Sequence, residues 1–243
     1  MLAAGDRNGA YKMFQKAIEI TPHHARTLMM ELQKRGIEFI TAPYEADAQL
    51  AYLIKTNYIV SVITEDSDLL VFGCPRVFYK MDQAGNGCEV RLKNLGANTD
   101  LNFTGWDHEQ FQQMCIFAGC DYLDSLPNVG IKKAHTYMKQ YKSWQHALRR
   151  IRLEGKTTVP STYEKDFELA FLTFKHQRVY DPIQKKLVHL NPIDEEFTKK
   201  FPDTSFLGPS VFRRCNDNIL RTREHITELC THVAFSLQPF SLL

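Results

Sequence analysis

The sequence lacks the features that mark several protein classes. Its 243 residues include six cysteines without a C-x-x-C pair, which excludes a dense disulfide framework and a zinc ribbon and favours reduced, intracellular thiols. No apolar run is long enough to cross a bilayer, and the first residues lack a signal peptide's basic and apolar segments, so we expect no membrane contact. A large charge excess is also missing, since 30 Lys and Arg oppose 28 Asp and Glu. Any nucleic-acid surface must therefore gather its basic residues locally.

What is present is an ordinary globular composition, with 44% hydrophobic residues, and a change of pattern near residue 106. Before it, two apolar strands flank a helix, which predicts a β-α-β unit with parallel strands, and a Gly85-Asn86-Gly87 turn predicts a hairpin. After it the pattern is mostly helical. Strands are predicted at residues 37–42, 59–64, 77–81 and 89–92, an extended segment at 182–190, and helices at 8–19, 22–35, 45–56, 107–118, 131–139, 144–152 and 163–176.

Acidic side chains follow both predicted parallel strands. Glu45 and Asp47 come just after the first strand, and Asp66 and Asp68 just after the second. Because parallel α/β sheets bind ligands at the carboxyl ends of their strands, these four side chains are expected at one edge. Their repulsion is usually relieved by a hard divalent cation such as Mg²⁺. A single acid in such a place is often only a helix N-cap, so the prediction depends on the joint placement.

Three segments then give a resemblance to a known family. Residues 42–50 (APYEADAQL), 63–70 (ITEDSDLL) and 119–123 (GCDYL) resemble, in the right order, blocks of the flap endonuclease and XPG family of structure-specific 5′ nucleases. Residues 71–74 (VFGC) and 80–83 (KMDQ) are similar to the exonuclease branch of that family. The resemblance extends over about residues 1–190.

The resemblance implies a fold and an activity. The fold is a PIN-like α/β parallel sheet flanked by helices, followed by a helical helix–two-turn–helix DNA-binding region. The activity is a Mg²⁺-dependent 5′→3′ double-strand DNA exonuclease with 5′-flap endonuclease activity, working by two-metal phosphodiester hydrolysis. Its substrate is duplex DNA with a 5′ end, nick or flap, in mismatch repair and recombination in the nucleus, with mismatch-repair proteins as possible partners. The Mg²⁺-binding carboxylates implied by motif match are Glu45, Asp47, Asp66, Asp68 and Asp121, the last from the resemblance alone.

Residues 126–134 (LPNVGIKKA) resemble the family's helix–two-turn–helix. A turn of this kind aims backbone N–H groups at phosphates, and Gly130, Lys132 and Lys133 are the expected DNA contacts. The resemblance also implies a K⁺ ion near Ser125 and Val129, although Ala118 stands where the exonuclease branch usually has a serine. Without the turn, a lysine pair on a solvated helix face would be the simpler interpretation.

The resemblance also predicts the domain organisation. We expect a partial nuclease core with a remnant of the helical arch at 1–105, a helix–two-turn–helix region at 106–190 and a divergent tail at 191–243. The family's N-terminal strands, two further Asp residues and a Lys/Arg pair have no match here. We therefore expect a truncated, catalytically crippled form of the enzyme.

Two other functions stay open. One is a DNA-binding fragment without catalysis. The other is a haloacid-dehalogenase-type phosphatase, suggested by Asp66-Ser67-Asp68 after an apolar strand. That class needs a small or hydroxyl residue two places after the second Asp, where Leu70 stands. It also tends to carry a later acidic pair, and the chain has no Asp-Asp.

Overall fold

The computed structural model describes residues 9, 11, 13, 14, 21–210 and 233–235, which fall into two compact units. The first unit consists of residues 1–41 and 214–236 and contains α2 (Pro22–Lys34), β1 (Phe39–Thr41) and β7 (Val233–Phe235). α2 follows Thr21, whose N–H donates to His24 Nδ1 (3.1 Å), and it ends before Gly36, which has a left-handed φ of 67°. Of the helix predicted at 8–19, the four described positions are helical and the others lie outside the described residues.

The predicted β-α-β pairing is wrong in one respect. β1 pairs antiparallel with β7, whereas β2 (Val62–Ile63) pairs in parallel with β3 (Arg76–Tyr79). The strand predicted at 59–64 is shorter because the N–H groups of Tyr58 and Ile59 donate to Leu53 O at the end of the preceding helix (2.8 and 3.3 Å). Those N–H groups are therefore not available to a strand ladder. Among the described strands, β1 and β2 are not paired, because the crossover rule fixes the handedness of a connection between parallel strands and does not require the two strands to be neighbours.

The second unit consists of residues 42–213 and 237–243 and contains a three-stranded sheet with the order β2-β3-β4, together with α3 (Ala46–Lys55) and α4 (Asp68–Val71). β3 and β4 (Cys88–Arg91) form the antiparallel hairpin that the glycine turn predicts. Gly87 is required there because a Cβ at this position would lie 2.5 Å from the Phe78 ring. This sheet, with one parallel and one antiparallel pair, confirms a mixed α/β fold.

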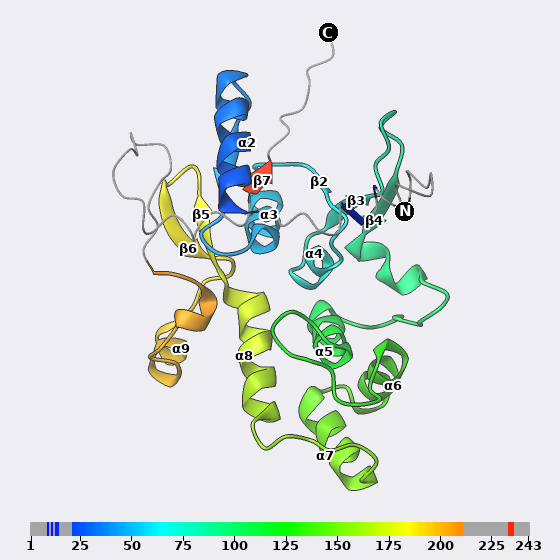
Figure 1. Ribbon diagram of the computed structural model, residues 1–243. Helices are drawn as coiled ribbons and strands as arrows, with labels where there is room; N and C mark the ends of the chain where they lie inside the picture. Colours follow the sequence, from blue (N-terminus) through cyan, green and yellow to red (C-terminus); the bar gives the residue numbers. More distant parts are fainter. Residues whose placement is uncertain (1–8, 10, 12, 15–20, 211–232, 236–243) are drawn as a thin grey trace. The chain divides into compact units, whose positions relative to one another are not determined.

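Helices dominate the rest of the second unit, as the sequence predicts. Asp107 caps the first α-helix of this region by accepting from Gln110 N (2.7 Å), and Lys142 and Gly155, both with left-handed backbone, end the next two α-helices. Figure 1 shows these helices gathered on one side of the unit. They are η2 (Leu92–Ala97), α5 (His108–Ala118), α6 (Ile131–Tyr141), α7 (Trp144–Glu154) and α8 (Tyr163–His176).

A hairpin that the sequence analysis only half predicts follows α8. β5 (Arg178–Asp181) pairs antiparallel with β6 (Lys186–His189), so the extended segment expected at 182–190 begins with a turn, and β5 was missed. α9 (Glu195–Lys200) and η3 (Ser205–Leu207) complete the unit, and Lys200 in α9 donates to Glu168 in α8 (2.6 Å).

Aromatic side chains make the core between these helices. Phe167 in α8 packs against Phe117 in α5 and Trp144 in α7, with ring centroids 4.8 and 4.6 Å apart. Phe174, in the last turn of α8, contacts Phe72 and Tyr122 with ring centroids 4.9 Å apart in each case. The second set reaches the segments that carry the acids described next.

The described helices include none long and apolar enough to cross a membrane. The four cysteines among the described residues, Cys74, Cys88, Cys115 and Cys120, are free thiols, and Cys215 and Cys230 lie outside them.

Candidate active site

The backbone places four of the predicted acids at two helix starts. Glu45 is the N-cap residue of α3 and Asp47 lies in its first turn. Asp68 is the first residue of α4, and its N–H donates to Asp66 Oδ1 (2.9 Å). The helix dipole favours a carboxylate near a helix N-terminus, which offsets part of the cost of placing acids there.

The fifth acid lies in a tight turn between α5 and the following loop. Cys120 and Leu123 exchange backbone hydrogen bonds of 3.0 and 3.2 Å, which leaves Asp121 exposed at the tip. Gly119, with a left-handed φ of 104°, lets the chain leave α5 against Ser125. The loop thereby brings a residue about 75 positions from Glu45 back to the other acids.

The five carboxylates interact electrostatically. Burial, then the charges of Asp66, Glu45 and Asp68, raises the pKa of Asp47 from 3.8 to about 7. Burial, followed by the charges of Asp66, Asp121 and Glu45, raises the pKa of Asp68 from 3.8 to about 6. Acids on three separate segments therefore face one another in a partly dry environment, and their mutual repulsion opposes folding when all are ionised.

Among the residues that the structure describes, no three His, Cys, Asp or Glu side chains are grouped closely enough to hold a metal ion. The chemistry of the donors nevertheless fits Mg²⁺, because they are all carboxylates. Mg²⁺ commonly binds through one or two carboxylates and keeps several of its waters. Glu45, Asp47, Asp66, Asp68 and Asp121 are thus the residues that could hold such an ion.

Two residues that the sequence analysis did not select contact Glu45. The Tyr122 hydroxyl donates to Glu45 Oε2, and Gln177 Nε2 donates to the same oxygen (2.8 Å). Tyr122 lies in the 119–123 segment that carries the family resemblance, next to the selected Asp121, so the sequence indicates its surroundings but not its contact with Glu45. Gln177 gave no signal, because it lies 132 positions from Glu45 between a helix and a strand.

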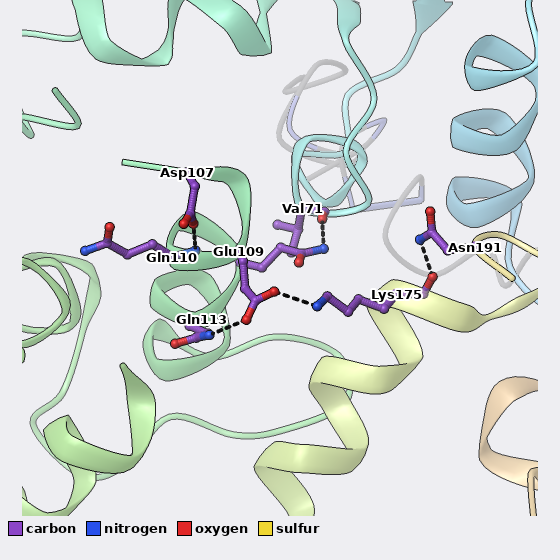
Figure 2. Close-up of polar contacts among 8 residues, drawn as sticks. Val71, Asp107, Glu109, Gln110, Gln113, Lys175 and Asn191 are labelled. Carbon is purple, nitrogen blue, oxygen red and sulfur yellow. Dashed lines mark hydrogen bonds and ion pairs between the residues drawn. The ribbon is translucent and has the colours of Figure 1, made fainter. Parts of the chain in front are cut away.

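α5 supports the acid-bearing α4 from the other side. Gln112 Nε2 donates to Val71 O (2.7 Å), and His108 Nε2 lies 2.9 Å from Leu70 O, so the last carbonyls of α4 are bound. Figure 2 shows Val71 beside α5, and the ion pair of Glu109 in α5 with Lys175 in α8 (2.6 Å). α5 therefore ties α4, the helix that begins at Asp68, to α8.

A second feature, the start of α6, carries the predicted basic pair. Gly130 is the N-cap residue of α6, and Lys132 and Lys133 are exposed in its first turn. Within the described chain neither lysine forms an ion pair, whereas Arg150 and Arg152 in α7 are paired with Glu154 and Glu164. The free cations at the helix start suit an anion better than Arg150 and Arg152 do.

Comparisons with known proteins now bear on these features. A family model, the XPG I-region, matches residues 36–121. The chain is 41% identical over 209 residues to exonuclease 1 of Arabidopsis thaliana, covering 86% of this chain and 28% of that protein. It is 44% identical over 238 residues to exodeoxyribonuclease 1 of Schizosaccharomyces pombe, covering 98% and 41%. The chain belongs to the flap endonuclease and XPG family.

The position of the family match is informative. All five acids lie within the matched I-region, residues 36–121, whereas the α6 start lies beyond it. This XPG-family chain spans well under half the length of the two curated relatives named above. Among solved structures, flap endonuclease-1 of Methanococcus jannaschii aligns over 68% of this chain and 49% of its own, with 23% identity and a TM-score of 0.49.

Proposed function

We propose that this chain is part of a structure-specific 5′→3′ DNA nuclease that depends on Mg²⁺. The observation that carries the proposal is the gathering of five acids from three segments of the XPG I-region, with the pKa of Asp47 raised to about 7. The names of the relatives, exonuclease 1 and exodeoxyribonuclease 1, support an exonuclease that acts on DNA. The 5′→3′ direction and the 5′-flap activity are taken from the family resemblance. A cluster of acids with raised pKa values in a family of nucleases is better explained by a cation site than by helix capping.

The roles of the chain's residues follow from their placement. Glu45, Asp47, Asp66, Asp68 and Asp121 would hold the cations, with two ions expected from the family resemblance. Bound Mg²⁺ supplies Lewis acidity and a more acidic water. Asp47 and Asp68 shed their protons to bind it, so occupancy is expected to rise steeply between about pH 6 and 8.

DNA binding is assigned to the start of α6. Exposed Lys132 and Lys133, with backbone N–H groups near Gly130, would contact phosphates of the duplex, as in a helix–two-turn–helix. Such contacts carry no sequence information, so the substrate class is duplex DNA with a 5′ end, nick or flap. A K⁺ ion near Ser125 and Val129 belongs to the same proposal.

The remaining assignments extend the same proposal. We assign the nuclease core to residues 1–105, the DNA-binding region to 106–190 and an additional tail to 191–243. A DNA-repair role, with action in the nucleus and mismatch-repair proteins as partners, follows from the family resemblance.

Cleavage of a labelled 5′-flap duplex tests the function. The cation-binding role of the acids predicts that any release of the flap by the chain depends on Mg²⁺ and is abolished by EDTA and by Asp66→Asn with Asp68→Asn. Measurable release would overturn the expectation of a catalytically crippled form. Asp100→Asn, an exposed acid in the loop before α5, is the matched control and should cleave like the wild type. Retained duplex binding without cleavage in any metal would instead favour the non-catalytic DNA-binding alternative.

A further inference from the structure

Gln177 is a fully buried polar residue that the proposed chemistry does not use. Its side chain has no exposed surface, and its Nε2 group donates to Glu45 Oε2 (2.8 Å) and to the Tyr122 hydroxyl oxygen (2.9 Å). Tyr122 in turn donates to Glu45 Oε2. Three side chains from α3, the loop after α5 and the end of α8 thus form a closed hydrogen-bonded triangle on one carboxylate oxygen.

Both donors are fixed by their own surroundings. The Tyr122 ring packs edge-on against Phe174, with centroids 4.9 Å apart. The Gln177 backbone is held at both ends, since its N–H donates to Thr173 O (3.1 Å) and its carbonyl accepts from Leu190 N (2.9 Å). The Tyr122 ring is therefore held by packing and the Gln177 side chain starts from a fixed backbone, so both present their donors to Glu45 from defined positions.

The orientation of the Gln177 amide follows the charge of Glu45. Its other end, Oε1, is buried without a hydrogen-bond partner within the described residues, a costly arrangement for an amide oxygen. The reverse orientation would place Oε1 against the carboxylate. The amide therefore donates to Glu45 through Nε2, while its Oε1 atom stays without a hydrogen bond among the described residues.

The two donors also distinguish the two oxygens of Glu45. Both bind Oε2, and in the part of the chain that the structure describes Oε1 accepts no hydrogen bond. One oxygen is anchored and the other is available to a ligand. Groups that anchor a metal-binding carboxylate in this way tune its affinity for the ion.

We propose that Tyr122 and Gln177 are positioning residues, which hold Glu45 through Oε2 in the orientation that receives the cation. This inference rests on the proposed function, because it takes Glu45 as a Mg²⁺ ligand. It assigns to these two residues an effect on Mg²⁺ affinity, beyond their contribution to packing.

The test measures Mg²⁺ binding to the whole chain by isothermal titration calorimetry, with thermal unfolding in parallel. Tyr122→Phe removes one donor and keeps the ring, and Gln177→Met removes the other at similar volume. The matched controls lose equivalent contacts elsewhere: Tyr137→Phe removes a hydroxyl bound to Glu154 (2.9 Å), and Gln110→Met removes a buried amide bound to Met138 O (3.0 Å).

We expect the Mg²⁺ dissociation constant to rise about 10-fold in Tyr122→Phe and Gln177→Met and to stay at the wild-type value in both controls. A loss of Tm with unchanged Mg²⁺ affinity in both variants would overturn the inference, since a purely structural role predicts that result.

A double-mutant cycle separates this inference from the proposed function. In the absence of metal, Tyr122→Phe combined with Glu45→Gln should change the Tm by less than the sum of the single changes, whereas Tyr137→Phe with Glu45→Gln should be additive. Additivity for Tyr122 would contradict the positioning role. If the wild type binds no Mg²⁺ the proposed function fails, and the cycle still decides whether Tyr122 acts on Glu45.

Discussion

Replacing Asp47 with Asn should stabilise the metal-free protein at alkaline pH. The pKa of Asp47 is raised from 3.8 to about 7 by burial and by the charges of Asp66, Glu45 and Asp68. An acid with a higher pKa in the folded state is ionised at a cost when folded. That cost is absent below about pH 4, grows between pH 4 and 7, and is complete above about pH 7.

The magnitude follows from the same values. Moving a carboxyl pKa from 3.8 to about 7 corresponds to about 4 kcal/mol, at about 1.4 kcal/mol per tenfold change in proton affinity. Because Asp47 is only half-buried, solvent screening reduces the figure to about 1–2 kcal/mol. For a chain of this size, that equals an increase in Tm of about 2–8 °C.

Thermal unfolding in EDTA, followed by calorimetry at pH 5 and pH 8, provides the assay. Asp47→Asn should exceed the wild type in Tm at pH 8, and the difference should shrink at pH 5. Saturating Mg²⁺ should raise the Tm of the wild type more than that of the variant. Asp100→Asn, outside the cluster, is the control. A Tm for Asp47→Asn at or below the wild-type value at pH 8 would refute the reasoning.

Three further predictions follow from packing and charge. Phe174→Ala should lower the free energy of unfolding by about 3–5 kcal/mol, measured in urea, because its ring is 1% exposed and packs between α4 and the acid-bearing loop. Gly87→Ala should destabilise the hairpin by about 1–3 kcal/mol in the same assay, since its Cβ would lie 2.5 Å from the Phe78 ring. Lys132→Ala with Lys133→Ala should weaken duplex binding for every sequence tested. The same double variant should reduce the slope of log K against log salt by about 2 in fluorescence anisotropy, and an unchanged slope would remove α6 from the DNA interface.

The longer helices were predictable from the sequence because their signals are local, whereas the short helices α4 and α9 were not predicted. Asp107 and Gly119 delimit α5, and Gly130 stands at the N-cap of α6. Strand pairing depends on partners distant in sequence, so the pairing of β1 with β7 was not predicted. β5 was missed because its four residues follow α8 directly, with Gln177 alone between them.

The acids of the candidate site were predictable from the sequence, and the residues that support them were not. Four of the acids are visible because they follow predicted strands in recognisable runs, such as Asp66-Ser67-Asp68, whereas Asp121 came from the family resemblance alone. Their supports are invisible for the opposite reason. Gln177 reaches Glu45 across 132 positions, and Gln112 reaches Val71 across 41. A hydrogen bond between distant residues leaves no periodicity in the sequence, so only the structure reveals it.

Three of the residues that support the acid-bearing segments share one chemical property, which connects the fold to the proposed function. Gln49 in α3 exchanges hydrogen bonds with the Tyr180 backbone (2.8 and 2.7 Å), Gln112 binds the end of α4, and Gln177 binds Glu45. All three are buried and uncharged. A lysine or arginine in these places would hold the acid-bearing segments equally well, but it would neutralise the acids and compete with a cation. Neutral amides fix the geometry and leave the negative charge uncompensated. A protein selected for stability alone would relieve that repulsion, so its retention favours a site kept for a cation.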